Sequence, residues 1–128
     1  MPRIDGVVFE KIPGSHEDER RTLTAFFNMD VPGFKKAEQL KMAVAKEDCV
    51  LGRHYHDYAE LFFVITGEAF FKLEDRGAGK QDAIILPTGY RLLIPPLVWH
   101  EAQVERGTLL LCLTEERYVS PAHNDHKV

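Results

Sequence analysis

Cysteine is scarce in this 128-residue chain, and no apolar run approaches the length that a helix needs to span a bilayer. The two cysteines, Cys49 and Cys112, stand in separate apolar stretches. They therefore predict buried free thiols in a reducing compartment rather than a disulfide framework. The first residues also lack the positively charged start and apolar run of a secretory signal peptide. We expect a cytoplasmic protein that makes no contact with a membrane.

An excess of positive charge is also absent. The chain carries 16 Lys plus Arg against 20 Asp plus Glu, a formal net charge of -4, and its pI is about 5.8. Nucleic-acid binders normally present a basic face, so this balance disfavours a nucleic-acid partner. Hydrophobic residues make up 45% of the chain and charged residues 28%, which are ordinary globular proportions. At this length one domain can bury a core without metal or disulfide staples.

Short apolar runs separated by glycine and proline fill the chain from residue 39 onward. Such runs, spaced at about ten residues, are typical of an all-β sandwich or barrel with little helix. We predict one all-β domain over residues 1–128, with its core at about 34–118, a charged surface segment at 14–21 and a polar, fraying tail at 119–128. The apolar runs that predict strands are 40–44, 49–51, 61–66, 69–73, 83–86, 92–94, 98–104 and 109–113.

One of these runs, from Leu61 to Ile65, is apolar at every position. Side chains alternate between the two faces of a strand, so both faces of this strand should be buried. One face would line the interior of a barrel, and the other needs a second sheet or another subunit. We therefore predict a homodimer.

The segment that carries chemistry runs from Gly52 to Glu60. His54 and His56 point to the same face of a strand because they are two residues apart, and Glu60 returns to that face at even spacing. His100 lies on a later strand and meets them if the sheet closes into a barrel. Three imidazoles and one carboxylate suit a first-row divalent ion such as Fe, Mn, Ni, Cu or Zn, with positions left open for substrate or water.

These residues resemble the first sequence motif of the cupin superfamily, in which His-x-His is followed by Glu and then Gly. His54, His56, Glu60 and Gly67 match its spacing, while the leading Gly is displaced to Gly52.

The second cupin motif is matched by Gly89, Pro95 and His100, while Leu97 replaces its middle Gly and Val104 replaces its final Asn. The resemblance covers about residues 40–115. It implies a small jelly-roll β-barrel with a metal ion or a substrate inside.

A narrower resemblance is to the sugar 3,4-ketoisomerases and the dehydrorhamnose 3,5-epimerases, which are cupins that act on nucleotide-linked 6-deoxy-4-keto sugars. Asp18-Glu19-Arg20 is similar to the Asp-x-Arg near the start of those proteins, and Trp99-His100-Glu101 is similar to their Trp-His-Glu. Arg21 stands where those proteins have Gly. In those proteins an Arg comes directly before the Gly that precedes the histidines, whereas in this chain Arg53 comes directly after Gly52. This resemblance implies a metal-free reaction in which an imidazole moves a proton next to a ketone, whereas most other cupins with this ligand set hold an ion.

The resemblance also suggests roles at the site. In the metal-free form, His56 is the acid or base beside His54, Glu60 holds the ring of His56, and Tyr58 or Tyr118 supplies a second proton donor. The alternatives are that the four metal-competent groups fill a barrel without chemistry, and that the tyrosines are core or interface residues.

Tyr58 is also a candidate for substrate binding, and so are three further residues. Arg53 and Arg91 suit a phosphate or carboxylate because a guanidinium binds such anions in a bidentate manner. Trp99 suits stacking on a nucleobase or sugar ring. The alternatives are solvated charges at strand ends and a tryptophan that plugs the barrel.

The sequence therefore predicts a cupin that binds a small molecule and isomerises or epimerises a nucleotide-linked keto sugar. One alternative is a metal-dependent cupin of another class, either a dioxygenase or a non-sugar isomerase. The other is a cupin that binds a metal or ligand without catalysis.

Overall fold

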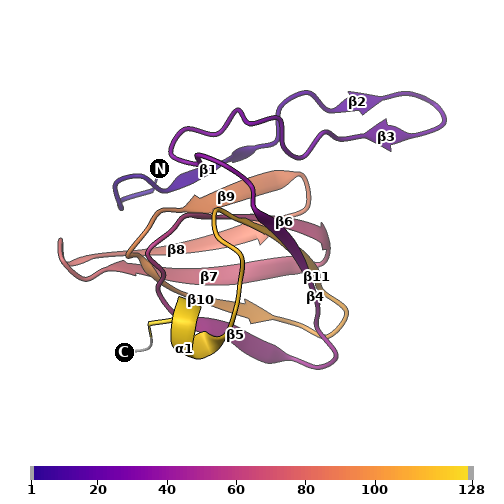
Figure 1. Cartoon of the computed structure of the whole chain (residues 1–128). Coiled ribbons are helices and arrows are strands. Elements are labelled where there is room, and N and C mark those ends of the chain that lie inside the picture. Colours follow the sequence, from indigo (N-terminus) through magenta and orange to yellow (C-terminus); the bar gives the residue numbers. More distant parts are fainter. Residues whose placement is uncertain (1, 127–128) are drawn as a thin grey trace.

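The computed structural model describes residues 2–126, which form two antiparallel sheets packed face to face (Figure 1). The expected all-β architecture is confirmed. The five-stranded sheet has the order β1 (Val8–Lys11), β9 (Tyr90–Ile94), β6 (Glu60–Thr66), β11 (Leu109–Thr114), β4 (Gln39–Val44). The four-stranded sheet has the order β5 (Cys49–His54), β10 (Trp99–Val104), β7 (Glu68–Asp75), β8 (Lys80–Pro87).

Two smaller elements complete the described part of the chain. Strands β2 (His16–Glu17) and β3 (Thr22–Leu23) form a hairpin, and α1 (Pro121–Asn124) is the one helix within residues 2–126. That helix is too short to cross a membrane, and the described residues contain no helix that is long and apolar enough to do so.

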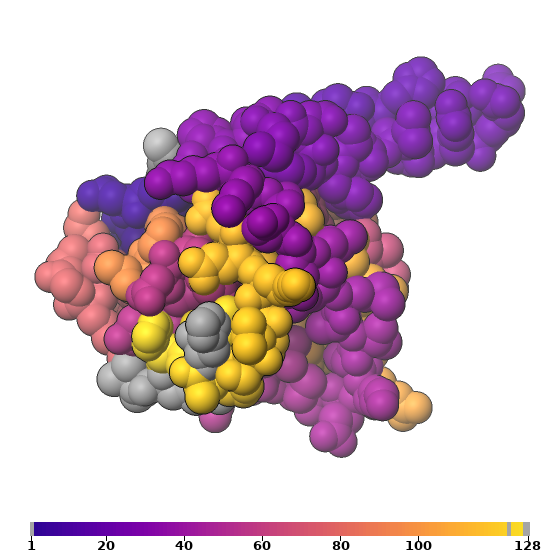
Figure 2. Space-filling view, viewed as in Figure 1, coloured from indigo at the N-terminus to yellow at the C-terminus, as the bar shows by residue number. Residues whose placement is uncertain are grey.

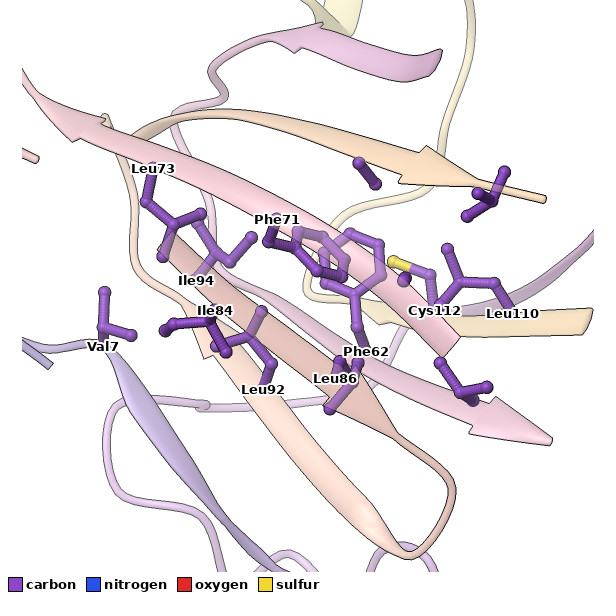
Figure 3. Close-up of a cluster of buried hydrophobic side chains, with 14 of the residues drawn as sticks. Val7, Phe62, Phe71, Leu73, Ile84, Leu86, Leu92, Ile94, Leu110 and Cys112 are labelled. Atoms are coloured by element: carbon purple, nitrogen blue, oxygen red, sulfur yellow. The ribbon is translucent and has the colours of Figure 1, made fainter. Parts of the chain in front are cut away.

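The core lies between the two sheets, where the inward side chains of both interdigitate (Figure 3). Phe62 on β6 and Phe71 on β7 pack ring against ring, with centroids 5.0 Å apart. Full burial of a side chain of this size stabilises the fold by about 1.5–3 kcal/mol. The core residues labelled in Figure 3 are Val7, Phe62, Phe71, Leu73, Ile84, Leu86, Leu92, Ile94, Leu110 and Cys112.

The outer face of β6 is also buried, as its uniform apolar pattern predicts. The cover comes from the N-terminal part of the same chain and not from a second subunit, which corrects the premise of the homodimer prediction. Phe26 packs edge-on against Phe63 with ring centroids 5.3 Å apart, and Phe34 lies in the same apolar cluster as Leu61.

The β2–β3 hairpin projects from the barrel as an arm (Figures 1 and 2). Its turn is closed by the Asp18 carboxylate, which accepts hydrogen bonds from the backbone N–H groups of Arg20 at 2.8 Å and Arg21 at 3.1 Å. These bonds lower the pKa of Asp18. The segment that resembles the start of the sugar isomerases is therefore a solvent-exposed hairpin turn.

Candidate functional site

The structure brings His54, His56, Glu60 and His100 together on the inner side of the barrel. One ligand atom from each of the four lies within 4.8 Å of the others. The ring centroids of His54 and His56 are 4.3 Å apart, and those of His54 and His100 are 4.8 Å apart. The cluster joins both sheets, because Glu60 begins β6 while His54 and His100 lie on β5 and β10.

Local irregularities in β5 and β10 place the two strand histidines opposite each other. His54 pairs with His100, and the register shifts between His100 and Glu101. Gly52 adopts a φ of 85°, and a Cβ there would lie only 3.0 Å from the carbonyl oxygen of His100. A glycine at this position therefore permits the close approach of the two strands.

Glu60 is the centre of the cluster. Its Oε1 lies 2.8 Å from Nε2 of His56 and 3.1 Å from Nε2 of His100, while its Oε2 accepts a hydrogen bond from the Cys112 thiol at 3.2 Å. Burial alone would raise the pKa of Glu60, but the contacts with His100 and His56 outweigh it and hold the pKa well below the ordinary value. The carboxylate is therefore ionised.

Two of the histidines are oriented by backbone carbonyls. Nδ1 of His56 donates to the carbonyl oxygen of Asn124 at 2.8 Å, and Nδ1 of His100 donates to that of Val98 at 3.1 Å. A carbonyl only accepts, so each ring carries a proton on Nδ1, and its Nε2 faces Glu60. Burial lowers the pKa of His56, but Glu60 and the carbonyl of Asn124 raise it by more.

This arrangement fits a divalent first-row metal ion. Nε2 of His56 and Oε1 of Glu60 are buried and close together but lack the geometry of a hydrogen bond, as expected of two atoms that face a common ion. Metal-binding histidines characteristically donate their other N–H to a carbonyl or carboxylate. His54, His56, Glu60 and His100 would hold the ion, which would polarise a substrate carbonyl when bound.

We expect Zn²⁺ or Ni²⁺ to raise the melting temperature of the chelator-stripped protein. At 100 times the dissociation constant, binding to the folded state adds about 2.7 kcal/mol of stability. His100→Ala removes one donor and should lose most of this shift. Thermal melts with and without the ion measure it, and equal shifts in both proteins would show that the ion binds elsewhere.

A cavity of about 250 Å³ lies next to the cluster. Its polar lining is Lys41, His54, Glu60, His100 and Cys112, and the rest is mainly apolar. β4 and β5, the edge strands of the two sheets, both contribute to its wall. A small, largely apolar cavity with a few convergent polar groups is typical of a ligand site.

The two predicted catalytic residues lie in different environments, because His54 lines this cavity and His56 does not. The ring of His56 is 3% exposed and stacks on Tyr58, with centroids 4.7 Å apart and an interplanar angle of 18°. Burial, and then the charge of Glu60, raise the pKa of Tyr58. Tyr118 lies beneath Lys41, whose Nζ is 4.9 Å from the ring centroid.

Arg53 and Trp99, both predicted to bind substrate, lie outside the barrel. Arg53 donates from Nε to Glu101 at 3.2 Å, and its side chain is 65% exposed. Trp99 precedes the inward-facing His100 on β10, so it points to the outer face. The guanidinium of Arg76 lies 5.3 Å from its ring centroid.

Arg91 also faces away from the cluster. It pairs with Phe63 on the outer face of the five-stranded sheet, and its guanidinium donates to Glu10 at 2.7 Å and Asp30 at 3.0 Å. Burial lowers the pKa of Arg91, but these two carboxylates raise it by more. The arginine therefore ties the N-terminal segment to the barrel in this structure and does not contact the cavity.

We expect Arg91→Met to lower the free energy of unfolding by about 1.5–3 kcal/mol, the usual contribution of hydrogen bonds to charged groups. Affinity for a nucleotide sugar should not change, because the side chain lies on the other face of β9. Urea titration and calorimetry measure the two quantities. Weaker ligand binding with unchanged stability would place Arg91 at the binding site after all.

Sequence reasoning missed three residues near the cluster: Lys41, Cys112 and Asp125. Strand alternation could have identified Cys112. In β11 its side chain faces inward, while those of its neighbours Leu111 and Leu113 face outward. Asp125 gave no such signal, because it lies within the polar segment, 119–128, that was expected to fray.

Two facing antiparallel sheets with three histidines and a glutamate on their inner side define a cupin. The chain belongs to the family described as WxcM-like, C-terminal, whose model matches residues 6–125. No curated protein sequence matches the chain.

Solved structures share the fold. A TDP-quinovose 3,4-ketoisomerase from Campylobacter jejuni superposes with a TM-score of 0.82 at 20% identity, over 97% of this chain and 95% of that one. A dTDP-4-dehydrorhamnose 3,5-epimerase from Sulfolobus tokodaii gives 0.82 at 21% identity, over 97% and 78%. A mutant of the 3,4-ketoisomerase QdtA from Thermoanaerobacterium thermosaccharolyticum, in complex with TDP-4-keto-6-deoxyglucose, gives 0.76 at 22% identity, over 91% and 85%.

Proposed function

We propose that the protein isomerises or epimerises a nucleotide-linked keto sugar. The observation that carries this proposal is the cavity in which His54, His100 and the Glu60 carboxylate meet beside an apolar wall. The structures similar to this chain include sugar 3,4-ketoisomerases and a 3,5-epimerase, which supports the same class of reaction.

The reaction needs a base beside a ketone. The base removes the proton from the carbon next to the carbonyl, and the electrons of that C–H bond form a C=C bond while those of C=O move onto oxygen. In an isomerase, the former carbonyl oxygen takes up a proton in place of the one that the neighbouring hydroxyl loses, and the former carbonyl carbon receives the proton that the base removed, which moves the ketone. In an epimerase, the proton returns to the original carbon from the opposite face.

We assign proton abstraction to His54. Its side chain is 16% exposed and borders the cavity, so its ring reaches a bound substrate. His56 lies behind the cavity and contacts Glu60, so its proposed role is to hold that carboxylate and not to touch the sugar. This revises the sequence-based preference for His56 as the base.

The test is hydrogen exchange in deuterated water with TDP-4-keto-6-deoxyglucose. We expect deuterium to replace the hydrogen next to the ketone, followed by signals of a new sugar in the proton NMR spectrum. A thermal-shift panel of thymidine and uridine diphosphate sugars should identify the nucleotide. Neither exchange nor binding with any member of the panel would overturn the proposal.

The complete set of three histidines and one glutamate favours a second candidate, a metal-dependent cupin of another class such as a dioxygenase. The iron-loaded protein would then consume oxygen in the presence of its substrate. Exchange into a keto sugar by metal-stripped protein would exclude this alternative.

We also propose that the chain forms a homodimer. Leu40, Met42 and Val44 alternate on the outer face of the edge strand β4 and are 61%, 62% and 52% exposed. A row of exposed apolar side chains on a sheet edge is typical of an interaction surface. The β2–β3 arm projects beyond the barrel and offers a second surface that a partner chain could contact (Figure 2).

Light scattering during size-exclusion chromatography should give twice the 14.6 kDa chain mass. Met42→Lys should shift the population toward monomer, because it places a charge in the apolar row. Ile85→Lys is the matched control, since Ile85 is 55% exposed on β8 in the other sheet. A monomer for the unmodified chain at micromolar concentration would contradict the proposal.

A further inference from the structure

The C-terminal strap, residues 121–126, folds back onto the histidine end of the barrel. His126 forms two backbone hydrogen bonds with Tyr55, each of 2.9 Å, and its ring stacks on that of Tyr55 with centroids 4.9 Å apart. The sequence predicts a fraying polar tail over 119–128, and for residues 124–126 the structure differs. Asp57 also contacts the strap, with its Oδ2 3.2 Å from Nε2 of His126, so the residues on both sides of His56 hold the strap in place.

Asn124 fixes the turn of the strap from within. Its side-chain oxygen accepts hydrogen bonds from the backbone N–H of Val119 at 2.6 Å and Ser120 at 3.1 Å, and its amide donates to the carbonyl of Arg117 at 3.3 Å. The residue is 3% exposed. Because the turn is closed in this way, the next residue has a defined position.

That next residue is Asp125, whose carboxylate lies against two histidines of the cluster. Its Oδ2 is 3.4 Å from Nδ1 of His54, and its Oδ1 is 3.4 Å from Nδ1 of His56. The side chain is only 7% exposed, and its Oδ1 is buried without a hydrogen bond of good geometry. A carboxylate this well buried must be compensated by the polar groups around it.

We propose that Asp125 is a positioning residue that holds the proton of His54 on Nδ1. A carboxylate has no proton to donate and carries its charge 3.4 Å from Nδ1 of His54, so it favours the ring form with the proton on that nitrogen. His54 then presents Nε2 as the ring nitrogen that accepts a proton or binds a metal ion. Nδ1 of His56 already donates to the carbonyl of Asn124 at 2.8 Å, so the proton on that nitrogen depends less on Asp125.

The consequence for the reaction rests on the proposed function. A base must be unprotonated at the nitrogen that faces the substrate. Asp125 meets this requirement by holding the proton of His54 on Nδ1, so that Nε2 can accept one. The tautomer itself does not depend on which substrate the cavity takes.

Long-range nitrogen–proton NMR of ¹⁵N-histidine-labelled full-length protein, at about pH 8 and so above the usual histidine pKa of about 6.5, reads the tautomer of each ring. We expect the Nδ1–H tautomer at His54. Asp125→Ala should shift the His54 nitrogens toward the Nε2–H tautomer and leave His56 on Nδ1. Asp125→Asn keeps an oxygen acceptor and should retain the wild-type pattern. Asp5→Ala, which removes a 97% exposed carboxylate, is the charge-matched control.

If Asp125→Ala changes the tautomer signals of both His54 and His56, the strap has detached. The spectrum of Asp125→Asn then tests the proposal. A His54 spectrum that stays the same in Asp125→Ala, or that changes in Asp125→Asn, overturns the proposal. With a keto sugar that the protein turns over, Asp125→Ala should lower kcat and leave KM nearly unchanged. If no such sugar reacts, the proposed function fails while the tautomer measurement still tests the role of Asp125.

Discussion

Replacing Glu60 with alanine should lower the free energy of unfolding by about 3–5 kcal/mol, the largest stability effect that we expect from a single change at the site. Loss of one partner from a buried charged cluster leaves the others without compensation. His56 and His100 both face Glu60 Oε1, and the Cys112 thiol donates to Oε2, so three buried groups lose their partner at once. Urea denaturation monitored by circular dichroism measures the change.

The control is Glu68→Ala, which removes an exposed carboxylate at the start of β7 and should change stability by no more than about 0.5 kcal/mol. The pH dependence gives a second check. The pKa of Glu60 is depressed in the folded state, so its contribution is present above the ordinary value of 4.5 and is lost as the pH falls. Equal acid sensitivity in wild type and Glu60→Ala would argue against this account.

Replacing His54 with asparagine should reduce turnover of a nucleotide-linked keto sugar by about 10²–10⁴-fold, the usual contribution of a general base. The fold should persist, because His54 ends β5 and is the most exposed of the three clustered histidines. Deuterium exchange next to the ketone measures the chemical step directly, and calorimetry measures substrate affinity.

His16→Asn provides the comparison, since His16 lies on the β2–β3 arm with a 63% exposed side chain. It should react at the wild-type rate. Wild-type exchange in His54→Asn would move the base to another residue, with His100 next because it also lines the cavity.

The strands and the histidine cluster could both be predicted from sequence, the strands from short apolar runs and the cluster from the cupin-like spacing of its residues. The residue types at 61–65 and 109–113 indicate strands, but the single strand face expected for His54, His56 and Glu60 was wrong, because β5 ends at His54 and Glu60 begins β6 in the other sheet. Alternation along Leu40, Met42 and Val44 likewise identified β4 against helix-forming neighbours.

The surroundings of the cluster could not be predicted in this way. Arg91 has the residue type of an anion-binding group, but its register in β9 turns it toward carboxylates of the N-terminal segment, which are distant in sequence. Trp99 is turned outward by the same alternation that turns His100 inward. The strap depends on backbone hydrogen bonds, which any sequence can form, and so its composition suggested only a tail.

The position of β11 has a consequence for how the chain folds during synthesis. This strand lies between β6 and β4 in the five-stranded sheet, yet it is the last strand of the described chain to be made. A nascent chain that stops before residue 109 leaves β4 and β6 without their shared neighbour, with the inner apolar faces open to solvent. The barrel therefore closes only after its final strand leaves the ribosome, and chains stalled earlier should be recognised by chaperones or aggregate.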